Sequence, residues 1–297
     1  GQDNLFRGSY EEAREELERL LKNSIRGQMV ADVPVGAFLS AGIDSSTIVS
    51  LMQSLSERKV RSFTIGMWDE KFNEATAAKE IAACLGTEHT ELYITEEDAK
   101  QVIPGLADMF GEPFADSSQI PTYLVSRMTR EHVTVSLSGD GGDELFCGYN
   151  TYTSVDRIWN KTNKIPDVIR KPASGLLGLV AGSRQGAMAT RARLLGADSI
   201  EDMYLRSEIG EGFQIQKKVK NNNSYQTIMD TYPAGYLTEP QHNLMLMDLL
   251  MYHPDDILNK VDRTAMAVSL ETRVPMLDRD VVEFAWRLPL SYRKENG

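Results

Sequence analysis

Residues 33–46 read VPVGAFLSAGIDSS, an apolar run followed by a turn of small and polar residues. The apolar run, residues 33–39, is typical of a short buried strand. The turn contains Gly42, and the residues that follow it, 45–57, favour a helix. A strand that passes through a glycine turn into a helix is the repeating element of an α/β fold.

The same alternation continues along the first half of the chain. An amphipathic helix is predicted over residues 10–26, where Ser9 and Glu12 have the spacing of a capping box. Further strands are predicted at residues 60–67, 89–94 and 132–137, and helices at 96–103, at 118–131 and between Asn73 and Gly86. Strands that alternate with helices predict a doubly wound parallel sheet, which binds ligands at the carboxyl ends of its strands.

Strand signals fade after residue 150. The remaining residues are predicted to be mostly helical, with interruptions at the polar loop Lys218–Ser224 and at Pro233, Pro240 and Pro254. We therefore expect an α/β core at residues 28–150 and a helical portion at residues 151–297.

The composition excludes several classes of protein. The 297 residues are 41% hydrophobic and carry a formal net charge of -11, which argues against broad binding to nucleic acid. No apolar run approaches the roughly 20 residues of a membrane helix, so no membrane contact is expected. The two cysteines, Cys84 and Cys147, have no disulfide or zinc-ligand pattern, which favours a reduced, cytoplasmic location.

The turn at residues 40–46 has the features of an anion site. Backbone N–H groups at the start of a helix attract anions, and Ser40, Ser45 and Ser46 add hydroxyl donors. Asp44 would repel a phosphate unless a hard cation such as Mg²⁺ lay between them. The turn alone is equally consistent with an ordinary strand-to-helix connection capped by Asp or Ser.

A second tract, SGDGGDELFCGY at residues 138–149, follows the strand predicted at 132–137. Its glycines cost backbone entropy, which a purely structural loop has little reason to bear, and they would let a ligand approach the backbone closely. Asp140 and Asp143 could face one cavity, one on a metal ion and one as a base. A surface loop capped by acids is the alternative, but the tract lies at the same predicted sheet edge as the first turn.

A third tract, NKVDRTAMAVSLETRVPMLD at residues 259–278, interleaves charged and apolar residues. By itself it is typical of a helix that turns Val, Met and Leu toward a core and forms ion pairs on its other face.

Together the three tracts resemble the synthetase domain of the asparagine synthetase family, a branch of the ATP pyrophosphatases with an SGGxDS loop. The first tract is similar to the loop of the GMP, NAD and argininosuccinate synthetases. The patterns SGDGGDELFxGY and DRxxMAxSLExRVPxLD are particular to the asparagine synthetase branch. The resemblance covers the chain from about Ser9 onward and implies an adenine nucleotide α-hydrolase-like fold.

The resemblance implies ATP and Mg²⁺ as cofactors and assigns their sites. The pyrophosphate end of ATP would lie against Ser40, Gly42, Asp44, Ser45 and Ser46, and adenosine against Phe38, Leu39, Ile65, Ser138 and Gly139. Asp44 and Asp143 would bind Mg²⁺, and Asp140 would be the base toward ammonia. The third tract would support the site without a catalytic role.

Members of the family use ATP to convert a carboxylate into an acyl-adenylate with release of pyrophosphate. Ammonia then displaces AMP and leaves an amide, so a small carboxylate, aspartate in this branch, and ammonia are the implied partners. Two alternatives stay open from the residues. One is a related ligase that amidates a sugar acid or a peptide carboxylate, or closes a β-lactam ring; the other is a non-catalytic homologue that binds nucleotide.

The chain departs from the family pattern in several places. Ala41 replaces the first glycine of the usual pair, which is harmless where its φ is negative, and Asp140 stands where many relatives have Glu. The glutaminase domain of the family, with its N-terminal cysteine, has no counterpart here, so a glutaminase domain or subunit outside this chain is expected. Relatives also continue beyond residue 297 with lysines that reach the pyrophosphate. We therefore expect an excised fragment that binds ATP weakly and does not complete the reaction.

Overall fold

The computed structural model describes residues 4–67, 73–181, 186–208 and 236–294. The chain divides into two compact units, the first made of residues 1–146 and 252–293 and the second of residues 147–251 and 294–297. The sequence analysis placed the α/β core at residues 28–150. In the structure, a segment from the end of the chain also joins the unit that contains the sheet.

The first unit is built on one parallel sheet with the strand order β3-β2-β1-β4-β5. Its strands are β1 (Val35–Phe38), β2 (Arg61–Met67), β3 (Glu88–Ile94), β4 (Val135–Leu137) and β5 (Glu271–Arg273). The chain moves outward from β1 to β3 and then returns to place β4 on the other side of β1, so strand order reverses between β1 and β4. The predicted doubly wound parallel sheet is confirmed.

The strand β5 corrects the interpretation of the third tract as one helix. Residues Asn259–Met266 form the helix α14, which ends before Ser269, a residue with a φ of 58°. The chain then forms β5, pairs with β4 and enters a short 3₁₀ turn, η6 (Pro275–Leu277). A strand of three residues has too little alternation to be recognised in the sequence.

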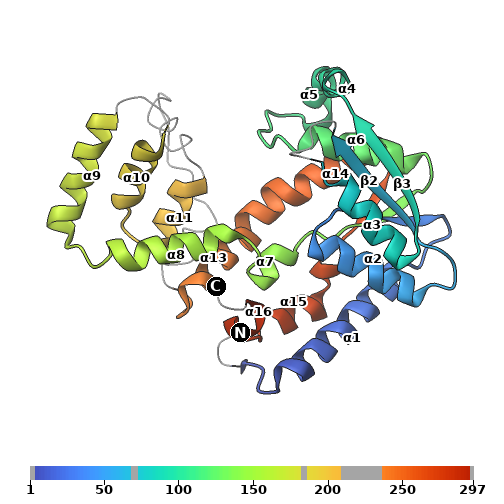
Figure 1. The fold of residues 1–297 in the computed structure, drawn as a ribbon, viewed down its shortest axis with the longest axis horizontal. Coiled ribbons are helices and arrows are strands. Elements are labelled where there is room, and N and C mark those ends of the chain that lie inside the picture. The colour runs from blue at the N-terminus through green and yellow to red at the C-terminus, as the bar shows by residue number, and fades with distance from the viewer. Residues whose placement is uncertain (1–3, 68–72, 182–185, 209–235, 295–297) are drawn as a thin grey trace. The chain divides into compact units, whose positions relative to one another are not determined.

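Helices cover the sheet on two sides (Figure 1). The helix α2 (Ile43–Leu55) packs on β1, and α1 (Tyr10–Gln28) and α3 (Ala75–Leu85) pack on α2. The helix α6 (Gln119–Arg130) packs on β2, and α14 and α4 (Glu96–Val102) pack on α6. The remaining helical segments of this unit are η3 (Ile103–Gly105), α5 (Leu106–Phe110), α7 (Gly142–Phe146), α15 (Arg279–Ala285) and α16 (Leu290–Arg293).

Local signals in the sequence explain where several helices begin and end. The predicted capping box is present, because Glu12 N donates to Ser9 Oγ at 3.2 Å and Ser9 N donates to Glu12 Oε2 at 2.7 Å. Gly86 ends α3 with a φ of 75°, a conformation that favours glycine. These two signals set the residues at which α1 begins and α3 ends.

Apolar clusters between the sheet and α6 anchor this side of the unit. One contains Phe63, Met128, Val133, Ala265 and Leu270, and so joins β2, α6 and α14. Burial of an apolar side chain of this size contributes about 1.5–3 kcal/mol. The clusters hold α14 against the sheet. The strand β5 follows α14 in the chain and pairs with β4.

The second unit is helical, as predicted for this part of the chain. Its described helices are α8 (Asn150–Thr162), α9 (Asp167–Ala181), α10 (Ala187–Leu195), α11 (Ile200–Glu208) and α13 (Pro240–Met247). Pro240 occupies the first helical position, where its missing N–H has no helical partner to lose. The predicted loop Lys218–Ser224 and Pro233 lie outside the described residues.

Pro254 was predicted to interrupt the helical structure, and in the structure it does not. It lies within the π-helix η5 (Asp248–Leu258), which continues directly into α14. A proline removes one backbone donor and clashes in a regular α-helix. The irregular backbone of a π-helical segment accommodates this loss without ending the helix.

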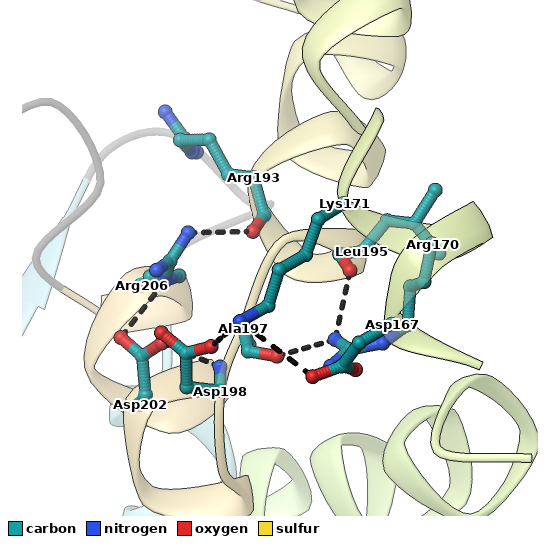
Figure 2. Close-up of polar contacts among 9 residues, drawn as sticks. All are labelled: Asp167, Arg170, Lys171, Arg193, Leu195, Ala197, Asp198, Asp202 and Arg206. Atoms are coloured by element: carbon teal, nitrogen blue, oxygen red, sulfur yellow. Dashed lines mark hydrogen bonds and ion pairs between the residues drawn. The ribbon is translucent and has the colours of Figure 1, made fainter. Parts of the chain in front are cut away.

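A buried arginine holds α9 to the segment after α10 (Figure 2). The Arg170 side chain is 2% exposed, and its guanidinium donates to Leu195 O at 2.9 Å, to Ala197 O and to Asp167 Oδ1 at 2.6 Å. It also lies over the Trp159 ring of α8, 5.7 Å from the centroid. One side chain therefore satisfies carbonyls at the end of α10 and connects three helices.

Neighbouring ion pairs extend this network. Lys171 pairs with Asp198 at 2.5 Å, and Arg206 pairs with Asp202 at 2.8 Å and donates to Arg193 O at 3.3 Å (Figure 2). Exposed pairs of this kind contribute about 0–1 kcal/mol each. The buried Arg170 is therefore the member of the network on which the packing of these helices depends.

Candidate active site

The first glycine turn connects β1 to α2, and its hydroxyl groups bind one another. Ser45 Oγ accepts from Ser40 N at 3.1 Å and lies 2.8 Å from Ser40 Oγ, which in turn accepts from Gly42 N at 3.1 Å. Ser46 Oγ donates to Gly42 O at 2.7 Å. These bonds close the turn at the N-terminus of α2, where the N–H groups of the first helical turn point away from the helix body.

The backbone at Ala41 is unstrained. Within the described parts of the chain, the non-glycine residues with positive φ are Cys147 and Ser269. Ala41 therefore meets the condition under which alanine in place of the family's glycine is harmless to the turn.

The second glycine tract follows β4 and lies directly against the first turn. A Cβ added at Gly139 would be 2.6 Å from Ser45 N, and one added at Gly142 would be 2.3 Å from Asp44 Cγ. Gly141 has a φ of 92° and faces Leu277. From the sequence, these glycines were expected to let a ligand approach the backbone. In the structure, Gly139 and Gly142 leave room for the neighbouring turn, and Gly141 provides the left-handed backbone.

The two turns bring Asp44, Asp140, Asp143 and Glu144 into mutual electrostatic range. Burial raises the pKa of Asp44 to about 6, with further contributions from Asp143, Glu144 and Asp140. Burial, followed by the charge of Glu144, raises the pKa of Asp143. A half-buried group of acids that resist ionisation is suited to a divalent cation, because a cation would favour their charged forms.

Asp140 follows the end of β4, in the second glycine tract. Burial raises the pKa of Asp140, and the Ser138 hydroxyl and the nearby His253 and Lys260 side chains act in the opposite direction. Glu144 is 1% exposed and its Oε1 lies 3.4 Å from His253 Nδ1, and both side chains are within electrostatic range of Asp140.

The residues expected around adenosine occupy the ends of adjacent strands. Leu39 N donates to Phe63 O at 2.9 Å, and the Leu39 side chain is buried. Phe38 and Ile65 are half-buried and pack against apolar clusters of the core. Ser138 is buried and its N–H donates to Arg273 O at 2.9 Å. With Gly139, which lies against the first turn, these residues share one edge of the sheet, and their contact with a nucleotide stays a prediction.

The third tract supports this edge. Arg273 donates to Gln28 O and, at 3.0 Å, to Val30 O, so it connects the end of β5 to the end of α1. Leu277 packs against Gly141, and Ser24 Oγ donates to Pro275 O at 3.0 Å. These contacts hold the second glycine tract in place.

Several titratable residues that lie in or near the site had no role predicted from the sequence. Glu144 was visible within the second tract, but nothing local marked its burial. His253 and Asp116 stand outside all three tracts, and Asp116 forms a short ion pair with Lys260. Pairing between residues 144 positions apart leaves no pattern in a single sequence.

Comparison with known proteins identifies the family. The family model for asparagine synthase matches residues 16–297. The chain belongs to the asparagine synthase family. The resemblance inferred from the three tracts is thereby confirmed.

Relatives of asparagine synthase type cover most of the chain. It is 34% identical to asparagine synthetase [glutamine-hydrolyzing] 1 of Bacillus subtilis over 98% of this chain and 47% of that protein. It is 32% identical to a putative asparagine synthetase of Mycobacterium tuberculosis over 93% of this chain and 42% of that protein. A putative asparagine synthetase of Methanocaldococcus jannaschii is 37% identical over 68% of this chain. The chain thus spans about half the length of the curated relatives it matches.

Two further features of the described residues concern membranes and metal ions. Among the described residues, no helix is long and apolar enough to cross a membrane. No group of three or more His, Cys, Asp or Glu side chains in that part of the chain has the arrangement of a metal site. A metal ion held by Asp44 and Asp143 would therefore need oxygen ligands from elsewhere, and phosphate oxygens are the kind that Mg²⁺ commonly takes.

Proposed function

We propose that this chain is the ligase part of an ATP-dependent amide synthetase. It would activate a carboxylate as an acyl-adenylate, release pyrophosphate and pass the acyl group to ammonia. The observation that carries the proposal is the contact of the two glycine turns, which gathers Asp44, Asp140 and Asp143 at the ends of β1 and β4. In open parallel sheets, ligands bind where strand order reverses.

The first turn is suited to the phosphates of ATP. Its Ser40, Ser45 and Ser46 hydroxyls and the N-terminus of α2 supply donors, and they are already ordered by bonds among themselves. Asp44 and Asp143 fit Mg²⁺, because both are half-buried oxygen donors, and no cation among the described residues contributes to the pKa shift of either. When bound, Mg²⁺ supplies positive charge against the charge that develops on pyrophosphate.

The proposed chemistry has two displacements. A carboxylate oxygen of the substrate attacks the α-phosphorus, and the bond to pyrophosphate breaks. The nitrogen of ammonia then attacks the acyl carbon, the bond to AMP breaks, and one proton must leave the nitrogen. Asp140 is suited to accept that proton, because burial raises its pKa and so strengthens it as a base.

Aspartate is the carboxylate we propose, because the relatives covering most of this chain are named asparagine synthetases. Those relatives are also named glutamine-hydrolyzing, so we propose that ammonia comes from a glutaminase domain or subunit outside these residues.

The test is formation of AMP and pyrophosphate from ATP by the native full-length protein with ammonia and Mg²⁺. A panel containing aspartate, a sugar acid and a peptide carboxylate would be compared. The proposal expects aspartate to stimulate AMP formation and yield asparagine. Stimulation by another carboxylate would change the substrate. ATP binding without AMP formation from any carboxylate would favour a non-catalytic homologue and overturn the proposal.

A further inference from the structure

The helix α9 of the second unit has one packed face and one exposed face (Figure 1). On the packed face, Arg170 donates to Leu195 O at 2.9 Å, and Ser174 Oγ donates to Ala192 O at 2.7 Å. The exposed face is apolar, and all of its members except one proline are 60% to 81% exposed. They are Val168, Ile169, Pro172, Leu176, Leu179 and Val180.

These six residues form one continuous strip of surface, which we call the α9 stripe. At 3.6 residues per turn they fall within an arc of about 120°, roughly opposite the side chains that bind the segment at α10. From Val168 to Val180 the stripe extends about 18 Å along the helix. A surface helix of a soluble protein normally has one apolar face, turned toward its core. The second apolar face of α9 therefore points to a partner that covers it.

The size of the α9 stripe is that of an interface. At these exposures its six side chains present roughly 600 Å² of apolar surface, the upper end of the range for the largest patch on a monomer. The exposed Ile165 and Leu177 border the stripe. With them the surface approaches the area of about 800 Å² that each partner contributes to a standard interface. A Cβ built at Gly175, beside the stripe, would meet no described atom within 4 Å, so a second helix can approach closely there.

The spacing of the stripe is the same in both directions along the helix. Its members lie two, five and six residues before and after Ser174, the central residue of α9. A second α9 that runs antiparallel in this register therefore places an apolar residue opposite every member of the stripe. The pairs are Val168 with Val180, Ile169 with Leu179, and Pro172 with Leu176. Such a contact has two-fold symmetry, the commonest symmetry of protein dimers.

The charges around the stripe favour a second copy over other occupants. No charged residue occurs in Pro172–Ala181, so the stripe has nothing with which to select a charged peptide. Helices that lie on membranes are rich in lysine and arginine on their polar face. In α9, Arg170 is buried and Lys171 is paired with Asp198, and the whole chain has a net charge of -11, which opposes an anionic lipid surface. An antiparallel pair also brings opposite ends of the two helix dipoles together.

We propose that the α9 stripe is a homodimer interface, in which α9 packs antiparallel against α9 of a second copy of this chain. The pairing is independent of the chemistry proposed for the glycine turns.

Sedimentation velocity of the native full-length protein, over a wide range of concentrations, tests the pairing. The wild type should form dimers. Val168→Glu and Val180→Lys each place an uncompensated charge opposite an apolar residue at both ends of the contact, so each should raise the dimer Kd at least about 10²-fold. The control Val30→Lys, which adds the same charge at a side chain that is 75% exposed in the first unit, should leave the dimer unchanged.

A mixture of the two variants tests the antiparallel register. In a mixed dimer, the glutamate introduced by Val168→Glu faces the lysine introduced by Val180→Lys, and the other end keeps its two valines. An equimolar mixture should therefore recover dimers that neither variant forms alone. Ile169→Glu with Leu179→Lys is a second such pair, for use where a variant of the first pair does not fold.

Three results would each overturn the proposal. The first is a wild type that stays monomeric, whether or not it binds vesicles of phosphatidylcholine and phosphatidylglycerol. The second is a dimer that the folded variants form as tightly as the wild type. The third is a mixture of variants that fails to recover the dimer. Glutamate and lysine are good helix formers, so circular dichroism should show that the variants keep the helicity of the wild type.

Discussion

Replacing Asp44 by Asn should stabilise the free protein while weakening its binding of Mg·ATP. In the folded protein, burial and three neighbouring carboxylates raise the pKa of Asp44 from 3.8 to about 6. The folded state therefore binds a proton more tightly than the unfolded state. The folded state loses stability as pH rises from about 4 through about 6. Above that range the ionised Asp44 carboxylate destabilises the folded state.

The size of this destabilisation follows from the pKa shift of Asp44. The rise in pKa corresponds to at most about 3 kcal/mol. Asp44 is only half-buried, and solvent screening reduces the effect to about 1 kcal/mol. For a chain of this length, that is a gain in Tm of about 2 °C for Asp44→Asn at pH 7. The gain should vanish near pH 4, where Asp44 is protonated in the folded state.

Ligand binding should change in the opposite direction. If Asp44 holds Mg²⁺ against the phosphates, loss of its charge should weaken Mg·ATP binding about 10- to 100-fold. Thermal unfolding between pH 4 and pH 8 measures the first effect, and calorimetric titration with Mg·ATP measures the second. Asp108→Asn, which removes an exposed carboxylate from α5, is the matched control for net charge. A lower Tm for free Asp44→Asn at pH 7, or unchanged affinity for Mg·ATP, would refute the reasoning.

Three other variants test separate parts of the structure. Gly142→Ala would place a Cβ 2.3 Å from Asp44 Cγ, so the carboxylate must move away by about 1 Å. Calorimetry should then show an affinity for Mg·ATP that is reduced up to about 10²-fold. The control Gly27→Ala, whose Cβ meets nothing within 4 Å, should bind Mg·ATP normally. Asp140→Asn should form adenylate but lose roughly 10²- to 10⁴-fold in amide release, and equal losses in both half-reactions would assign Asp140 to ATP binding instead. Arg170→Met should lower the free energy of unfolding by about 2–4 kcal/mol, because it leaves the Leu195 and Ala197 carbonyls unpaired. Hydrogen exchange in α9 and α10 should become faster. Unchanged exchange there would show that the network is dispensable.

Much of the sheet could be predicted from the sequence because its signals are local. The strands β1 to β4 lie within or next to the predicted runs, and Ser9 and Gly86 mark helix ends by their own chemistry. The strand β5 could not be predicted, because three residues following a helix acquire their extended form from pairing with β4. The π-helix around Pro254 likewise depends on packing that a proline signal does not reveal.

The sequence predicted both glycine turns and their common edge of the sheet, but not the contact between them. Each glycine turn was identified from its own residues. Their contact, which explains Gly139 and Gly142, appears only when β1 and β4 are neighbours. The ion pair of Asp116 with Lys260 joins segments 144 positions apart. Residues of this kind acquire their role from tertiary structure alone.

The measurement that tests the central claim most directly is the fate of a carboxylate oxygen. Aspartate labelled with ¹⁸O in its side-chain carboxylate would be incubated with the native full-length protein, ATP, Mg²⁺ and ammonia. Attack of that oxygen on the α-phosphorus, followed by displacement of AMP, requires one ¹⁸O to appear in the phosphate of AMP. Label in inorganic phosphate accompanied by ADP, or unlabelled AMP with asparagine formed, would contradict the acyl-adenylate mechanism.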